Sequence, residues 1–301
     1  MAIARPACSL ALVLGGGCFT ADLDPDKTGV FACASDEDCA GDDVCVNQRC
    51  ESEVQTVEIR NPEDEDTFDV TDAALDMPRM ISVTIAGTLE LVAPGGDHVS
   101  GEGHIAVFVD GMEIAPVTSG PFSAGIVVPI TVANRPGPHR VAIKARRNDG
   151  TDYDNIGAQA TRLFWIDDGT PQVAIKSPWP NTTFGLDSQT ITFQVTSLRV
   201  MLVPPMAEGM IDPAKGHTHI YYDETFPACL MDPMCDPNYI AIGEARNQDL
   251  MATIPGSAET SATLTAVLRN VDHTLYLFDP DGDGPMEERP ILDTITIVRE
   301  E

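Results

Sequence analysis

Positive charge is scarce in this sequence, and long apolar runs are missing. Its 301 residues include 18 Lys and Arg against 47 Asp and Glu, which gives a formal net charge of −29. A surface this acidic repels phosphate backbones, so the composition argues against nucleic acid as a partner. Beyond the N-terminus, no stretch is apolar for long enough to span a bilayer.

Recognisable catalytic motifs are also missing. The sequence contains no G-x-S-x-G, no H-E-x-x-H, no phosphate-cradling glycine loop and no dinucleotide fingerprint. Because the cysteines are expected to be oxidised or lipidated, no free thiol nucleophile is expected either. We therefore predict that this protein is not an enzyme.

What the sequence does contain is turn residues and short apolar segments. There are 24 Gly and 23 Pro, 43 % of the residues are apolar, and helical 3.6-residue patterns are rare. The segment around Ile81–Leu91 instead alternates apolar with polar or small residues, which is typical of a half-buried strand. This mixture predicts an all-β protein with a globular core.

An internal repeat indicates how the strands are grouped. VEIRNPEDEDTF (57–68) returns as VAIKSPWPNTTF (173–184), ISVTIAGTLELVAP (81–94) as ITFQVTSLRVMLVPP (191–205), GEGHIAVFVD (101–110) as PAKGHTHIYYD (213–223), and PITVANRPGPHRVAIKARRNDG (129–150) as TLTAVLRNVDHTLYLFDPDGDG (263–284). Each copy is long enough to close a core of its own, so the repeat predicts two similar domains in tandem. In this alignment His139 matches His273, which predicts a shared structural role at the edge of the core.

The order of the strands resembles that of immunoglobulin-like and fibronectin-like modules. This resemblance implies two antiparallel β-sandwiches, at 54–168 and 171–301, joined by the short segment DDGTP. The second copy carries an apparent insertion at 224–256. A loop on a rigid sandwich is where recognition usually occurs, so this insertion is the expected contact for an unidentified protein or glycan ligand. In the second copy the alternation of apolar residues shifts by one position, which predicts a β-bulge near Thr196–Ser197.

The N-terminus reads as a targeting segment. Arg5, a short apolar stretch at Leu10–Leu14 and three glycines precede Cys18, which resembles a bacterial lipoprotein signal. Residues 1–17 would then be removed, Cys18 would carry acyl chains, and residues 18–30 would form a tether. The usual Leu is displaced by one position, and an ordinary secretory signal is the alternative. The resemblance implies a lipoprotein of the cell envelope, at the outer membrane or cell surface.

The cysteines agree with export. Four of them, Cys33, Cys39, Cys45 and Cys50, crowd into residues 31–52, with spacings unlike those of structural zinc sites. We expect a small module with two disulfides, whose pairing the sequence leaves open. It resembles the short Cys-rich units near the N-terminus of many Gram-negative envelope lipoproteins. Cys229 and Cys235 are expected to bridge within the insertion.

Two features of the second copy could bind a metal. His217 and His219 lie at i and i+2, so on a strand they share a face, and histidine is a common metal ligand. The first copy keeps His104 but has Ala106 at the matching position of His219. GHTHIYYD, with the later His-Thr-Leu at 273–275, resembles small exported bacterial domains with a Gly-His-x-His strand. Polar residues at a sheet edge are the alternative interpretation.

The other feature is the segment DPDGDG. Asp279, Asp281 and Asp283 occupy the first positions of a calcium loop, but Pro290 stands where its closing Glu would be. A solvated acidic turn is the alternative. If the His217 strand pairs with residues 273–278, the histidines and aspartates could meet and favour a transition metal over calcium.

These features together predict a lipid-anchored envelope protein with a binding or structural-spacer role and no catalysis. The alternative is a metal-binding envelope protein that uses the second sandwich. The sequence does not firmly predict any cofactor. Calcium and a transition metal both remain open as ligands.

Overall fold

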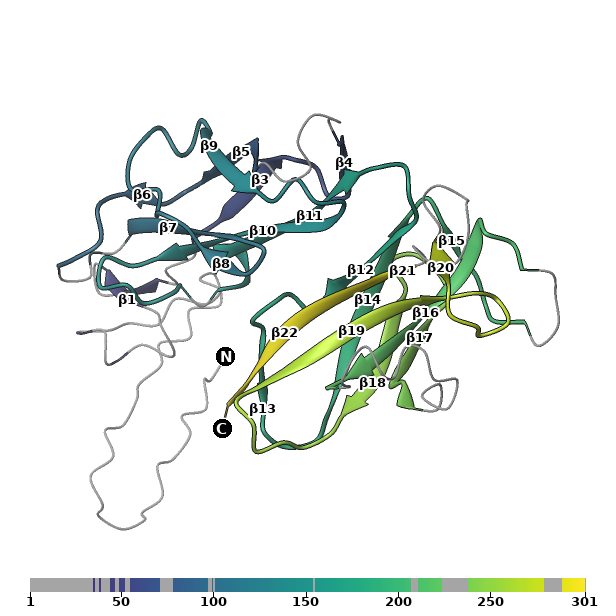
Figure 1. The fold of residues 1–301 in the computed structure, drawn as a ribbon. Helices are drawn as coiled ribbons and strands as arrows, with labels where there is room; N and C mark the ends of the chain where they lie inside the picture. The colour runs from purple at the N-terminus through teal and green to yellow at the C-terminus, as the bar shows by residue number, and fades with distance from the viewer. Residues whose placement is uncertain are drawn as a thin grey trace, which may run out of the picture. The chain divides into compact units, whose positions relative to one another are not determined.

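The structure is a computed structural model (Figure 1). It describes residues 35, 38, 44–46, 49–51, 55–70, 78–96, 99, 101–153, 155–206, 211–223, 238–278 and 289–300. The chain divides into two compact units, Met1–Glu53 and Val54–Glu301. Within the described residues, no helix combines the length and the apolar character needed to cross a bilayer.

The described part of the first unit contains a β-hairpin. Strand β1 (Val44–Val46) pairs antiparallel with β2 (Arg49–Glu51), and the backbone of Cys45 lies opposite that of Cys50. Cys18, Cys33, Cys39, Cys229 and Cys235 lie outside the described residues. The lipid anchor and the disulfides therefore stay predictions.

The second unit begins with a β-sandwich. One of its sheets has the order β3-β5-β9, and the other has the order β4-β11-β10-β7-β6 with β8 added on β7. The strands are β3 (Val57–Asn61), β4 (Asp66–Asp69), β5 (Arg79–Gly87), β6 (Glu90–Leu91), β7 (Glu102–Val109), β8 (Met112–Glu113), β9 (Ile126–Val132), β10 (Gly137–Arg146) and β11 (Gln159–Asp167). A 3-10 turn, Ile156–Ala158, precedes β11.

A second sandwich repeats this plan. Its sheets have the orders β12-β14-β18 and β13-β22-β19-β16-β15, with β17 added on β16 and a separate β20–β21 hairpin. The strands are β12 (Gln172–Ser177), β13 (Thr183–Gly185), β14 (Gln189–Leu198), β15 (Met201–Leu202), β16 (Lys215–Tyr222), β17 (Ala241–Gly243), β18 (Asp249–Ile254), β19 (Ser261–Arg269), β20 (Leu277–Phe278), β21 (Arg289–Pro290) and β22 (Leu292–Glu300).

Alternation of side chains explains why these segments form sandwiches. Along β5, Ile81 and Val83 are buried between more exposed neighbours, as the sequence predicts, and Ile85 and Ala86 are both buried. Each sandwich has its own cluster of buried apolar side chains between its two sheets. The predicted pair of sandwiches is confirmed. Most pairings are antiparallel, and short parallel ladders are added at edges, such as β4 on β11 and β13 on β22.

The structure corrects the C-terminal part of the predicted repeat. In the first sandwich β10 pairs with β7 and sets Arg146 opposite His104. In the second, β19 pairs with β16 and sets Arg269 opposite His217. Strand β10 therefore corresponds to β19, and the predicted match of 129–150 with 263–284 is wrong. The predicted pairing of the His217 strand with residues 273–278 is wrong for the same reason.

The predicted insertion and the predicted bulge are also corrected. Residues 224–256 include β17 and β18, and β18 pairs with β14 as β9 pairs with β5. The residues of these two strands are therefore regular sheet rather than insertion, whereas residues 224–237 lie outside the described part of the chain. The shift in the alternation of apolar residues comes after β14, at a turn where Arg199 has a φ of 61°. At this turn the chain passes from one sheet to the other. Strand β14 also pairs with β12, and the register irregularity of that pairing lies on β12, between Ile175 and Ser177.

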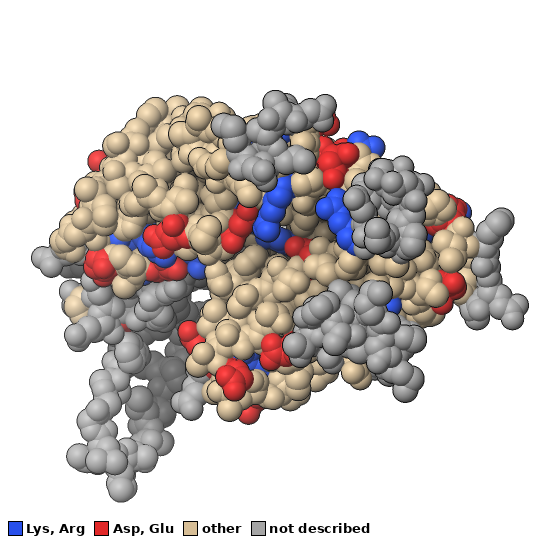
Figure 2. All heavy atoms as spheres, viewed as in Figure 1, with Lys and Arg blue, Asp and Glu red and all other residues tan. Residues whose placement is uncertain are grey.

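A buried ion pair joins the two sandwiches of the second unit. The guanidinium of Arg140, on β10, pairs with the carboxylate of Asp293, on β22, and both side chains are 8 % exposed. Arg140 also donates to the Ile175 carbonyl at 2.8 Å, and Asp293 accepts from the Ile175 amide at 2.8 Å. These groups satisfy one another away from water. More than half of the other acids among the described residues are exposed, and Figure 2 shows acidic side chains in separate groups over one face.

We predict that Asp293→Asn lowers the free energy of unfolding by about 3–5 kcal/mol, because it leaves the Arg140 charge buried without its counter-ion. Urea denaturation followed by circular dichroism measures this loss. Asp212→Asn is the matched control, since Asp212 forms an exposed pair with Lys215 at 2.9 Å and its loss should barely move the midpoint. Equal effects of the two substitutions would contradict the structural importance of the buried pair.

Candidate metal centre

Strand β16 carries the residues from which the site is built. Its side chains alternate, so that Ile220 points into the sandwich core while His217, His219 and Tyr221 share the opposite face. Both histidines are 0 % exposed and Tyr221 is 1 % exposed. The shared face of the two histidines was predicted from their spacing. Their complete burial means that they are not polar residues at an exposed sheet edge.

A third histidine comes from the turn that follows β19. The His273 amide donates to the Asn270 carbonyl at 3.0 Å, and the Asn270 amide donates to the Thr274 carbonyl at 2.9 Å, which closes a tight turn. Asp272 accepts from the Thr274 amide and hydroxyl at 3.0 and 2.6 Å. His273 has a φ of 69°, a left-handed conformation that histidine adopts more readily than most residues. The turn directs its ring onto the β16 histidines.

The three imidazoles converge on one point. His217 Nε2 lies 3.0 Å from His219 Nε2, which in turn lies 3.3 Å from His273 Nδ1. The three possible ligand atoms all lie within 4.8 Å of one another. Nitrogens bound to a tetrahedral zinc ion at about 2.05 Å would be about 3.3 Å apart. The separations of 3.0 and 3.3 Å are close to this value, so these two pairs of nitrogens have the spacing of ligands to one transition-metal ion.

The electrostatics of the site keep His217 and His219 neutral. Burial, followed by the charges of His273 and Arg269, lowers the pKa of His217 to about 4. Burial, followed by the charges of His217 and Arg269, lowers the pKa of His219 to about 3. A neutral imidazole is the form that binds a metal. No proton has to be displaced from these two rings at neutral pH.

Aromatic and apolar side chains line the cluster. The ring centroid of Tyr239 lies 4.3 Å from that of His219, and Tyr221, Val267 and Leu275 form an apolar cluster on the same side of the sheet. The Tyr221 hydroxyl lies 3.4 Å from His219 Nδ1, on the edge of the ring away from the other histidines. Tyr221 is thus placed to orient His219 rather than to bind the metal with it.

The structure brings together only some of the metal ligands that the sequence predicts. His217 and His219 come together, whereas Asp279, Asp281 and Asp283 lie outside the part of the chain that the structure describes. The sequence predicts for His273 the same structural role at the core edge as for His139 in the first copy, and this prediction is wrong. His139 Nδ1 instead contacts Asp110 Oδ2 at 2.7 Å. The resemblance to Gly-His-x-His domains, which includes His273, was the signal that could have identified the third ligand.

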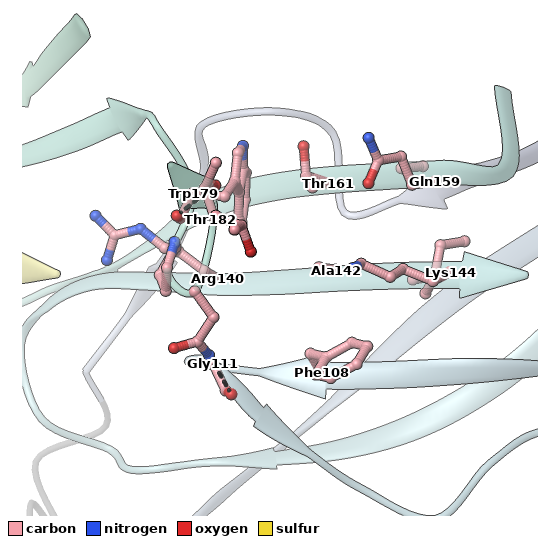
Figure 3. Close-up of a pocket in the computed structure, with 14 residues that line it drawn as sticks. Phe108, Gly111, Arg140, Ala142, Lys144, Gln159, Thr161, Trp179 and Thr182 are labelled. Carbon is pink, nitrogen blue, oxygen red and sulfur yellow. Dashed lines mark hydrogen bonds between the residues drawn. The ribbon is translucent and has the colours of Figure 1, made fainter. Parts of the chain in front are cut away.

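A groove of about 490 Å³ lies elsewhere in the second unit, on the outer faces of β7, β10 and β11 (Figure 3). The groove is lined by Trp179 and by four side chains of the first sandwich, Phe108, Lys144, Gln159 and Thr161. None of the three clustered histidines lines this groove. It offers aromatic and hydrogen-bonding surface, whereas the histidine cluster offers metal ligands.

A scan against protein-family models found no match, and neither did a search of curated proteins. Among solved structures, the chain is similar to the fibronectin(III)-like modules of CbhA from Clostridium thermocellum, with 10 % identity, a TM-score of 0.26, and coverage of 81 % of this chain and 94 % of that one. It is also similar to the N-terminal eight immunoglobulin domains of Down syndrome cell adhesion molecule, with 12 % identity and a TM-score of 0.29, covering 81 % of this chain and 28 % of that one.

A further neighbour is SGBP-B from Bacteroides ovatus, solved with a mixed-linkage heptasaccharide. It is 10 % identical with a TM-score of 0.20, and the match covers 81 % of this chain and 70 % of that one. At such identities the likeness concerns the fold alone. The sheet orders described above make both halves of the second unit immunoglobulin-like or fibronectin-like sandwiches.

The lowered pKa values predict a pH dependence of stability in metal-free protein. Unfolded histidines titrate near 6.5, whereas folded His219 stays neutral down to about pH 3. Its contribution is therefore complete above pH 6.5 and is lost as the pH falls from there towards 3. Between pH 7.5 and 5.5 the wild type should lose about 1 kcal/mol more than His219→Gln. Urea denaturation in EDTA measures both, and equal losses would contradict the neutral buried state.

Proposed function

We propose that this protein is a lipid-anchored envelope protein whose second sandwich binds one transition-metal ion through His217, His219 and His273. The observation that carries the proposal is the convergence of three imidazoles, with ligand atoms within 4.8 Å of one another. Two of these rings are fully buried. The alternative function expected from the sequence thereby becomes the leading one, with His273 as a ligand in place of the aspartates.

The donor set selects the kind of metal. Calcium takes oxygen ligands, whereas imidazole suits zinc, copper, iron and nickel. Three neutral histidines leave a fourth position for a ligand from outside the cluster. The role proposed is binding of the ion, and a non-catalytic protein remains our expectation. Calcium binding at Asp279–Asp283 stays a separate prediction.

The comparison of the two sandwiches supports this assignment. His104 is 4 % exposed at the position that corresponds to His217, but Ala106 stands at the position of His219. Among the described residues, the only group of three or more potential metal ligands found is the one in the second sandwich. The first sandwich therefore supplies a natural control.

We predict that isothermal titration of the purified protein with Zn²⁺ or Cu²⁺ gives one ion per chain, and that His219→Ala weakens binding by more than about 100-fold. A lost ligand should cost more than the 10–100-fold cost of losing a residue that only orients a ligand. Bound metal should also raise the melting temperature.

His104→Ala in the first sandwich is the matched control and should leave the affinity unchanged. A titration with Ca²⁺ in the same buffer distinguishes the histidine cluster from the acidic segment, because only the latter offers oxygen ligands. The absence of heat and of a melting shift with Zn²⁺ and Cu²⁺ would remove the proposal.

The location of the protein is tested separately. If Cys18 is lipidated, Cys18→Ser should move the protein from the membrane fraction to the soluble fraction of the cells, because the acyl chains would be its anchor. Fractionation followed by immunoblotting measures the shift. Unchanged partitioning would favour an ordinary secretory signal and another mode of attachment, and it would leave the metal site unaffected.

A further inference from the structure

Arg269 places a positive charge beside the three histidines. It ends β19 with its backbone opposite that of His217, and the residue is 3 % exposed. Its Nη2 donates to the Tyr221 hydroxyl at 2.8 Å, whereas its Nε is buried with no hydrogen-bond partner. None of the ion pairs between described residues includes Arg269.

A buried guanidinium of this kind needs a counter-ion. Removing a charge from water is costly unless it is paired and hydrogen-bonded, and the neutral Tyr221 hydroxyl supplies a hydrogen bond without a charge. The neighbouring histidines supply no negative charge either. Among the described residues, Arg269 thus has no ion-pair partner, and its Nε has no hydrogen-bond partner.

The first sandwich shows how the same position is normally neutralised. Arg146 lies opposite His104, as Arg269 lies opposite His217. Arg146 Nε contacts Asp152 Oδ1 at 2.7 Å, and its Nη1 contacts Glu113 Oε1 at 2.7 Å. Arg146 also forms an isolated bridge with Asp152, and Arg269 forms the matching bridge with Leu275. A leucine therefore stands where the first copy has a carboxylate.

A metal ion would sharpen this imbalance. Three neutral imidazoles around a divalent ion leave two positive charges close to the guanidinium, and like charges repel strongly where water is excluded. An anion in the fourth coordination position would offset both charges, and the planar guanidinium is well suited to carboxylates and oxyanions. Tyr239 lies against the His219 ring, and Leu275 belongs to the apolar cluster on the same side of the sheet, so a small anion suits these surroundings best.

We infer that the histidine site binds a small anion together with its metal ion, and that Arg269 is the protein group that holds this anion. The inference depends on the proposed metal site and names its co-ligand. The chemical class is a small carboxylate or oxyanion, such as formate or bicarbonate.

The test uses the full chain loaded with Cu²⁺ in a non-coordinating buffer. Sodium azide is the probe, because a copper-bound azide produces a charge-transfer band, and formate is then added as a competitor. We expect one azide per copper, displaced by formate. Arg269→Met should weaken azide binding about 10-fold or more, the loss that corresponds to a hydrogen bond to a charged group. Arg269→Lys should retain part of the affinity.

A second readout separates anion binding from a merely structural role. Without coordinating anions, Arg269→Met should bind Cu²⁺ more tightly than the wild type, because a like charge is gone. If Arg269 only stabilised the fold, the variant would bind copper more weakly and melt earlier. Arg146→Met, in the first sandwich, is the matched control and should change neither copper nor azide binding.

The outcomes distinguish the two proposals. If the wild type binds no copper, the metal site itself fails. If it binds copper but no azide, or if Arg269→Met binds azide as tightly as the wild type, the anion inference is overturned and the metal site stands.

Discussion

The proposed metal site depends on the two-residue period of strand β16. One face of the strand supplies Ile220 to the sandwich core, and the other face collects His217, His219 and Tyr221. Because the core fixes the register, the two histidines cannot move to the other face of the strand without turning Ile220 out of the core. Packing of the sandwich therefore holds the ligands in place before any metal is bound. Such pre-organisation is what a tight metal site requires.

The two sandwiches show how a structural scaffold can acquire a site. In both sandwiches an arginine lies opposite a histidine on the neighbouring strand. The pair is Arg146 and His104 on β10 and β7, and Arg269 and His217 on β19 and β16. The first copy neutralises its arginine with Asp152 and Glu113 and keeps a single histidine. The second adds His219 and His273 and has Leu275 in the position of the acid. Substitutions on one outer face thus changed the chemistry while the inner face preserved the fold.

The sequence alone predicted the parts that depend on local spacing. The alternation in β5 and the shared face of His217 and His219 both follow from the period of a strand. The sequence did not reveal that His273 reaches this face, because its place depends on a turn after β19 and on long-range pairing. Apolar residues alternate similarly in 263–269 and in 275–278. The sequence comparison aligned His273 and the residues after it with His139 and the residues after it. It therefore predicted that the His217 strand pairs with 273–278, whereas it pairs with β19. The imbalance at Arg269 becomes visible only once the register of the two sheets is known.

The most direct test of the central claim is X-ray absorption at the zinc edge of the purified, zinc-loaded protein. We expect one zinc per chain, with nitrogen scatterers near 2.0 Å and the outer-shell pattern of three imidazoles. A shell made of oxygen alone, or fewer than three imidazoles in a fully loaded sample, would contradict it.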